Sequence, residues 1–211
     1  MRNRRRHRLL LIACLTPVAA AVAQSAPGEW ASYHRDLSST RYSPLDQITR
    51  ENVATLTTAW TWKPDSAGRE AEFKNENTPI MVGGVLYFTT GLRRMVVAVD
   101  GATGAEKWRY QYGESDVRFR TAPRKGAGRG VGYWSDGREA RIFTVTPGYF
   151  LVALDAATGK LVESFGDHGV VDLKLNIGVP LNADSAVIGN SSPPLVFENI
   201  EIGRASCRER V

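Results

Sequence analysis

Cysteine and histidine, which often bind metals or act as nucleophiles, are few in this sequence and do not form clusters. The two cysteines, Cys14 and Cys207, lie near opposite ends of the chain. The long middle region therefore offers no thiolate metal site and no disulfide scaffold. His34 and His168 have no metal-ligand neighbours at the usual spacing. We interpret His34 as a contact in the N-terminal segment and His168 as a turn residue.

The positive charge of the chain is concentrated at its two ends. The formal net charge is +5, but five arginines lie within residues 1–8 and residues 201–211 carry +1, which leaves −1 for residues 9–200. The one basic cluster between them is predicted to be a solvated loop, because few aromatic residues accompany it; it comprises Arg118, Arg120, Arg124 and Lys125. The sequence therefore gives no support for a nucleic-acid partner.

Residues 1–23 have the pattern of a cleaved signal peptide. A basic segment precedes an apolar run of about 15 residues, and Ala21-Val22-Ala23 meets the small-x-small rule for cleavage before Gln24. The run is short for a membrane span. An uncleaved anchor is the main alternative. The segment predicts export, most simply to a bacterial periplasm, and leaves peripheral membrane association open.

Residues 201–211 have neither an apolar period nor a recognisable turn pattern. Their codons can be written so that they closely match a common sequencing adapter read in frame, so we expect an artefact here. A genuine basic tail is the alternative. If the artefact is real, the natural chain continues past Asn199 and the 211 residues are an N-terminal fragment.

A repeat occupies the middle of the chain. Ala98–Trp108 reads A-x-D-x-x-x-G-x-x-x-W, and Ala153–Glu163 repeats it 55 residues later with glutamate in the tryptophan position. The aspartate can accept backbone N–H bonds across a tight turn, and the glycine can take a positive φ. Trp108 is broad enough to wedge between adjacent sheets. We interpret these residues as architecture, not as catalytic groups.

The segments around each repeat predict four strands per unit. The first unit comprises 78–82, 85–89, 95–100 and 107–112, the second comprises 130–134, 141–145, 150–155 and 161–165, and a third begins at 194–197. A single short helix is expected over 48–56, capped by Thr49 or Asp46. Four strands in about 50 residues are typical of a β-propeller, an all-β fold.

The chain resembles the quinoprotein dehydrogenases, which use pyrroloquinoline quinone (PQQ) on an eight-bladed β-propeller. The resemblance rests on Trp30–Asp36, Thr40–Leu45, the segment from Asn52 to Trp60, and the two copies of the repeat. It implies that residues 24–200 are the N-terminal part of a partial eight-bladed propeller, with about three blade-equivalents present.

The resemblance carries three cofactor-binding positions onto this chain. Glu76 matches a carboxylate that contacts the quinone, and Arg129 matches an arginine paired with a cofactor carboxylate, a task that suits the planar guanidinium fork. Thr144 matches a hydroxyl donor, with its register open by one or two residues. Without the resemblance, the three would be a solvated loop charge, a surface turn residue and ordinary strand filler.

The resemblance also implies an activity. It is the oxidation of a sugar, polyol or alcohol hydroxyl, with calcium as Lewis acid, an aspartate base, and a quinone or cytochrome as electron acceptor. Many alcohol-oxidising members have two adjacent cysteines where this chain has Pro123-Arg124, which favours the sugar and polyol branch. The base and calcium ligands of the family lie in later blades, so no catalytic or metal residue is assigned here. We expect the 211-residue chain itself to be inactive and prone to aggregate.

A non-catalytic alternative remains open at this point. Propellers with the same tryptophan repeat also serve as periplasmic scaffolds for protein assembly, which bind partner strands at blade edges. A scaffold would not need Glu76, Arg129 and Thr144 directed toward one shared axial cavity, whereas a dehydrogenase would.

Overall fold

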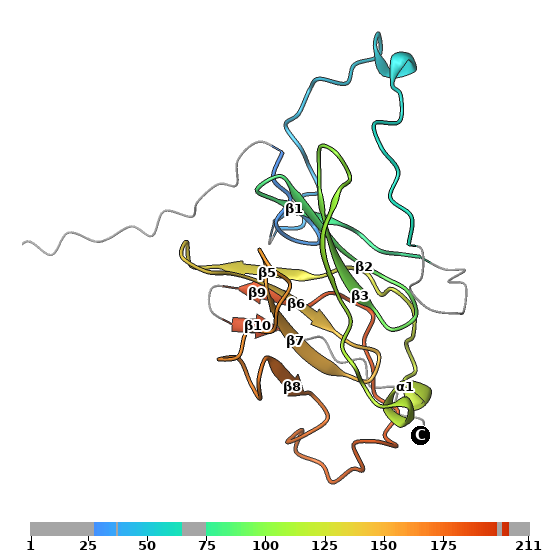
Figure 1. Cartoon of the computed structure of the whole chain (residues 1–211), viewed down its shortest axis with the longest axis vertical. Coiled ribbons are helices and arrows are strands. Elements are labelled where there is room, and N and C mark those ends of the chain that lie inside the picture. The colour runs from blue at the N-terminus through green and yellow to red at the C-terminus, as the bar shows by residue number, and fades with distance from the viewer. Residues whose placement is uncertain (1–27, 37, 65–74, 198–199, 203–211) are drawn as a thin grey trace, which may run out of the picture.

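The computed structural model describes residues 28–36, 38–64, 75–197 and 200–202, and its strands form three antiparallel sheets (Figure 1). The predicted signal peptide lies outside the described residues, as do residues 203–211. Strand β10 extends to Ile202, two residues past the expected boundary at 200. Across the ranges described, no helix is both long enough and apolar enough to cross a bilayer.

Two four-stranded sheets and a two-stranded one follow each other along the chain. The first comprises β1 (Ile80–Val82), β2 (Val85–Thr90), β3 (Met95–Asp100) and β4 (Glu106–Tyr110), the second comprises β5 (Gly132–Ser135), β6 (Ala140–Val145), β7 (Phe150–Asp155) and β8 (Val170–Asp172), and the third comprises β9 (Leu195–Phe197) and β10 (Ile200–Ile202). Each four-stranded sheet pairs its strands in sequence order. The predicted first unit and the start of a third are therefore confirmed, and the second unit has four strands as expected, although its fourth strand is not the predicted one.

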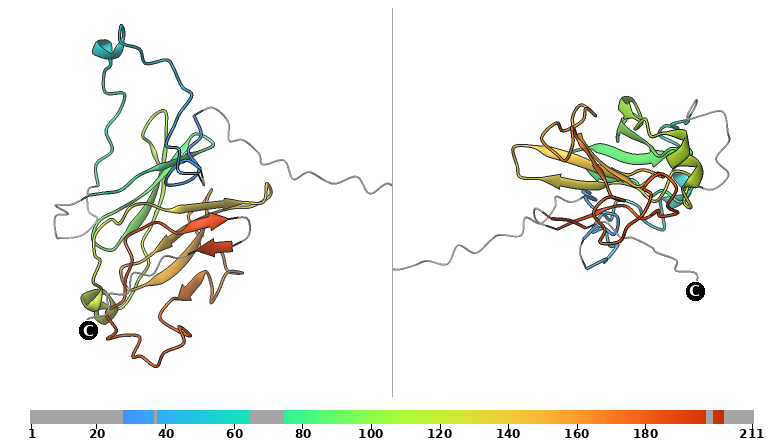
Figure 2. Two further views of the ribbon diagram at one scale, coloured as in Figure 1. Left: turned by 180° about the vertical axis from the view of Figure 1, so that it is seen from behind. Right: turned by 90° about the horizontal axis from the view of Figure 1, so that it is seen from below.

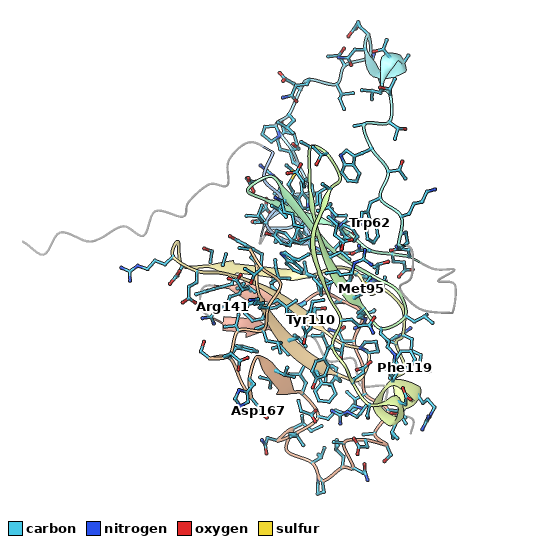
Figure 3. The ribbon with its side chains drawn as sticks, in the orientation of Figure 1. Trp62, Met95, Tyr110, Phe119, Arg141 and Asp167 are labelled. Atoms are coloured by element: carbon cyan, nitrogen blue, oxygen red, sulfur yellow. The ribbon has the colours of Figure 1, made fainter. Side chains whose placement is uncertain are left out.

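The main core lies between the two four-stranded sheets. Because side chains alternate along a strand, β3 directs Val96 and Ala98 toward the second sheet and Val97 toward its other face. The core between the sheets holds Ile80, Tyr87, Val96, Ala98, Trp108, Val131, Ile142, Val152, Leu154 and Ala156. Trp62 packs over the other face of the first sheet, against a cluster that contains Met95; both residues are labelled in Figure 3.

Trp108 joins the two sheets as predicted. Its indole N–H donates to the carbonyl of Ala156 (3.0 Å), which also accepts the Tyr87 hydroxyl (3.2 Å). Burial raises the pKa of Tyr87 to about 12, so this hydroxyl stays a donor at ordinary pH. A Cβ on Gly159 would lie 2.5 Å from the Trp108 ring. Only glycine therefore allows the indole to lie this close to the turn.

The strand expected over 161–165 is wrong. Leu161 makes a single bridge to Leu154, and the chain then turns, with the Phe165 N–H donating to the Val162 carbonyl (2.9 Å). The fourth strand of the second sheet is β8, which pairs with the start of β7. The apolar run alone did not distinguish a strand from a tight turn.

The helix expected over 48–56 is largely wrong. A 3-10 turn, η1, covers only Val53–Thr55, and its N-cap residue is Asn52 instead of Thr49 or Asp46. It lies on a long loop that leaves the sheets (Figures 1 and 2). The described α-helix, α1 (Asp116–Thr121), was not predicted. Ser115 caps it by accepting the backbone N–H of Arg118 (3.3 Å).

The expectation of a solvated loop over the basic cluster is wrong for Arg118, whose residue is 2% exposed. Its guanidinium lies over the Phe150 ring (4.3 Å) and donates to the Asp172 carboxylate and the Ala183 carbonyl. A buried charge is stable only when it is paired and hydrogen-bonded. Arg118 therefore ties α1 to the loop that follows β8.

Candidate functional site

Glu76 and Arg129 come from equivalent places in two successive sheets. Glu76 lies four residues before β1, and Arg129 lies three residues before β5. We call residues 75–79 and 128–131 the first and second lead-in segments. The backbone N–H of Thr78 donates to the carbonyl of Arg129 (3.1 Å), so the two segments run side by side.

The structure brings the two predicted side chains into contact. The Arg129 guanidinium lies 3.3 Å from Oε2 of Glu76, and each side chain is 45% exposed. Partial exposure screens the pair, so its contribution to stability is small. The exposed fork of Arg129 is instead available to a ligand that approaches from solvent.

Gly130 makes this close approach possible. Its φ is +129°, and a Cβ there would lie 2.7 Å from the carbonyl oxygen of Thr78. Any side chain would push the two lead-in segments apart. Gly130 therefore controls the separation of the backbones that carry Glu76 and Arg129.

Thr144 lies on an inner strand of the second sheet. It is on β6 opposite Val152, is 2% exposed, and its hydroxyl has no hydrogen-bond partner among the described residues. It makes no contact with Glu76 or Arg129 in the hydrogen bonds of the described ranges. Its role as a cofactor ligand stays a prediction.

A third lead-in segment was not singled out in the sequence. Residues 190–194 precede β9 as the other two segments precede β1 and β5, and a Cβ on Gly132 would lie 2.8 Å from the Pro194 carbonyl oxygen. The side-chain amide of Asn190 donates to the Ser192 carbonyl (3.2 Å) and accepts its N–H (2.9 Å). The spacing of the repeated units could have located this segment, because it precedes the first strand of the third unit.

Arg129 as a hydrogen-bond donor and Glu76 as an acceptor fit a planar quinone that carries carboxylates. Glu76 accepts from Nε and Nη2 of Arg129 (3.4 and 3.3 Å), and the other edge of the guanidinium, formed by Nη1 and Nη2, has the geometry to meet a ligand carboxylate. Glu76 supplies acceptor oxygens beside it. For a metal ion, no group of three or more His, Cys, Asp or Glu residues lies close enough in the described ranges. Calcium ligands are therefore not assigned to any residue.

The comparisons with known proteins place the chain in a family. Residues 30–210 match the family described as "PQQ: Glucose/ethanol/alcohol dehydrogenase, beta-propeller domain". The chain belongs to this family of PQQ-dependent dehydrogenase propellers, and the predicted resemblance is confirmed.

Individual relatives agree with this assignment. The chain is 33% identical to the glycerol dehydrogenase large subunit of Gluconobacter oxydans over 85% of its own length and 25% of that protein. It is 37% identical to the quinohemoprotein alcohol dehydrogenase ADH IIB of Pseudomonas putida, covering 78% of this chain and 24% of that one. The chain thus spans about a quarter of the length of these relatives.

A solved structure shows the same arrangement of strands. The quinohemoprotein alcohol dehydrogenase of Comamonas testosteroni superimposes with a TM-score of 0.63 and 27% sequence identity, over 86% of this chain and 23% of that chain. The all-β propeller fold predicted from the repeat is therefore supported.

Proposed function

We propose that the full-length protein to which this chain belongs is a periplasmic quinoprotein dehydrogenase. It oxidises the hydroxyl group of a sugar, polyol or alcohol with PQQ and calcium, and it passes electrons to a quinone or cytochrome. The observation that carries the proposal is the contact between Glu76 and Arg129, at the adjoining starts of two sheets in a chain of this family.

The two residues have different tasks in this proposal. Arg129 binds a carboxylate of the cofactor through its fork, and Glu76 accepts a hydrogen bond from the cofactor while it orients the guanidinium. Bound PQQ supplies the two-electron acceptor for substrate oxidation. Thr144 is proposed as a further hydroxyl donor. The glycerol and alcohol substrates named for the relatives, together with glucose, define the first substrates to test.

The propeller is proposed to have eight blades, with residues 24–200 as its N-terminal part. Resequencing the gene across codons 190–211 tests this arrangement. A reading frame that runs on into further repeats supports it, and a genuine stop codon after Val211 contradicts it. The 211-residue chain, expressed alone, is expected to show no PQQ-dependent dye reduction and to aggregate, because open sheet edges remain exposed.

The activity is tested by reconstitution. The full-length protein is purified without cofactor and assayed for reduction of an artificial dye with ethanol, glycerol and glucose. Activity is expected only after PQQ and Ca²⁺ are both added. Dye reduction that does not depend on PQQ would contradict the proposal. An absence of dye reduction with all three substrates would also contradict it and would favour the assembly scaffold.

A further inference from the structure

Arg94 is an arginine enclosed by the molecule at the turn between β2 and β3. The residue is 4% exposed and adopts a φ of +53°. Burial lowers the pKa of Arg94 to about 10, and the nearby Glu114 acts in the opposite direction. The guanidinium is therefore still charged at neutral pH. Among the described residues it forms no ion pair within 4 Å.

The charge of Arg94 is instead satisfied by three backbone carbonyls. Its guanidinium donates to the carbonyls of Arg124 (2.8 Å), Gly126 (3.2 Å) and Val145 (2.8 Å). The first two lie on residues 124–128, which we call the arginine loop, and the third lies at the end of β6. One guanidinium thus joins this loop to the end of strand β6 in the second sheet.

The backbone of the arginine loop packs closely against the Arg94 guanidinium. A Cβ on Gly128 would lie 2.9 Å from Nε of Arg94, and the φ of Gly128 is +72°. The backbone N–H of Gly126 also donates to the Leu92 carbonyl, in the same turn as Arg94 (3.1 Å). Gly128 is followed directly by Arg129. The residue that contacts Glu76 is therefore attached to the end of a loop that Arg94 holds.

The neighbouring Arg93 has a different partner. It donates to the Glu114 carbonyl (3.3 Å) and the Asp116 carboxylate (2.6 Å), and its guanidinium lies over the Phe119 ring of α1. Arg93 therefore anchors the helix at the beginning of the connection between the sheets, and Arg94 anchors the loop at its end.

We propose that Arg94 is a positioning residue for cofactor binding: it fixes the arginine loop so that Arg129 presents its guanidinium beside Glu76. The inference rests on the proposed function, because the ligand of Arg129 is taken to be a carboxylate of PQQ. Free of the three carbonyl contacts, the loop would sample many conformations. Arg129 would then lose orientation before it binds, which costs affinity.

The experiment compares Arg94→Met and Arg94→Lys with Arg141→Met in the full-length protein. Arg141 is a suitable control because it pairs with Glu139 and lies over Trp134 within its own sheet. Figure 3 shows it well away from Phe119 of α1. Lysine keeps the charge but lacks the planar guanidinium fork that donates to the three carbonyls, so it should give an intermediate effect. Gly128→Ala perturbs the same contact from the loop side if Arg94→Met fails to fold.

Two readouts separate positioning from general structure. Hydrogen exchange should become at least tenfold faster in peptides that cover 124–129 and stay unchanged in the strands. The PQQ concentration for half-maximal activity should rise at least tenfold, whereas kcat at saturating PQQ should stay within threefold. Arg141→Met should change neither. An unchanged PQQ requirement, or unchanged loop exchange, in Arg94→Met would overturn the inference.

Failure of the proposed function gives a different result. If the unmodified protein does not bind PQQ, the proposed function is wrong and the cofactor role of Arg94 fails with it. If hydrogen exchange in residues 124–129 still becomes tenfold faster in Arg94→Met, Arg94 does hold the arginine loop in place. If hydrogen exchange in these residues stays unchanged, the structural role of Arg94 is wrong too.

Discussion

The turns that end β3 and β7 are built alike, yet the chain behaves differently after each. Oδ1 of Asp100 accepts the Thr103 N–H and hydroxyl (3.0 Å each), and Oδ1 of Asp155 accepts those of Thr158 (2.8 and 2.6 Å). The first turn leads into strand β4, which carries Trp108. The second leads to one bridge at Leu161 and then to another turn.

The contrast in packing after the two turns comes from the residue four positions after the turn glycine, which is Trp108 in the first copy and Glu163 in the second. Trp108 is buried against the second sheet, whereas the Glu163 side chain is 72% exposed and contacts His168 (2.8 Å). Trp60 makes the same kind of joint with the first turn: it donates to the Gly101 carbonyl (3.1 Å) and lies against Gly104. The aspartate–glycine turn therefore reverses the chain by itself, while the joint to the next element depends on the tryptophan.

The largest expected effect is the loss of a tryptophan joint. Trp108→Ala should lower the free energy of unfolding by about 3–5 kcal/mol, because a buried indole and its hydrogen bond are removed. Trp60→Ala should cost roughly 2 kcal/mol, since Trp60 is only half-buried. Urea unfolding of the full-length protein measures both. Equal losses at the two positions would contradict the difference in burial.

The glycine beneath the tryptophan should have the next largest effect. Gly159→Ala places a Cβ 2.5 Å from the Trp108 ring at a φ of +70° and should destabilise by about 2–3 kcal/mol. Gly137→Ala is the matched control, because its φ is +85° but no atom lies within 4 Å of the added carbon. It should cost only about 1–2 kcal/mol of backbone strain. Similar values for the two variants would show that the joint tolerates the added methyl group.

The aspartates of the two turns should have smaller and equal effects. Asp100→Ala and Asp155→Ala each remove an acceptor of hydrogen bonds at an exposed turn, so each should cost about 1 kcal/mol. Thermal unfolding of both variants provides the measurement. A much larger loss for Asp100 would mean that the turn and the tryptophan strand after it are coupled.

The smallest effect concerns the pH dependence of His168, the contact of the glutamate that stands in the tryptophan position. The pKa of His168 is raised, first by its hydrogen bond to Glu163 and then by the charges of Glu163 and Asp167. A raised pKa in the folded state gives stability that is fully present below the unfolded pKa and is lost as pH rises through the folded pKa. NMR titration should give a midpoint above 6.5 that falls in Glu163→Gln. A midpoint unaffected by this substitution would contradict the contact.

The repeat allowed much of the fold to be predicted. Strands β3 and β7, the two turns and the docking of Trp108 all follow from local patterns of apolar residues, aspartate and glycine. The short helix α1 was missed because six residues with one buried side chain have almost no apolar periodicity.

The site was less accessible to sequence reasoning. The family resemblance assigned Glu76 and Arg129 separately to the cofactor, and the contact between these two side chains, 53 residues apart in the sequence, was not predicted. The burial of Arg94 and Arg118 could not be predicted, because an arginine that binds distant backbone carbonyls has the same local pattern as a solvated one. Long-range carbonyl contacts leave no periodic signal in the sequence.

The most direct test of the central claim is an equilibrium titration of PQQ with the cofactor-free, full-length protein. Arg129→Met should weaken PQQ binding about 10- to 150-fold, as expected for the loss of a charge-assisted hydrogen bond of about 1.5–3 kcal/mol. Glu76→Gln should weaken it less, and Arg141→Met should leave it unchanged. PQQ binding by Arg129→Met with the affinity of the unmodified protein would contradict the account.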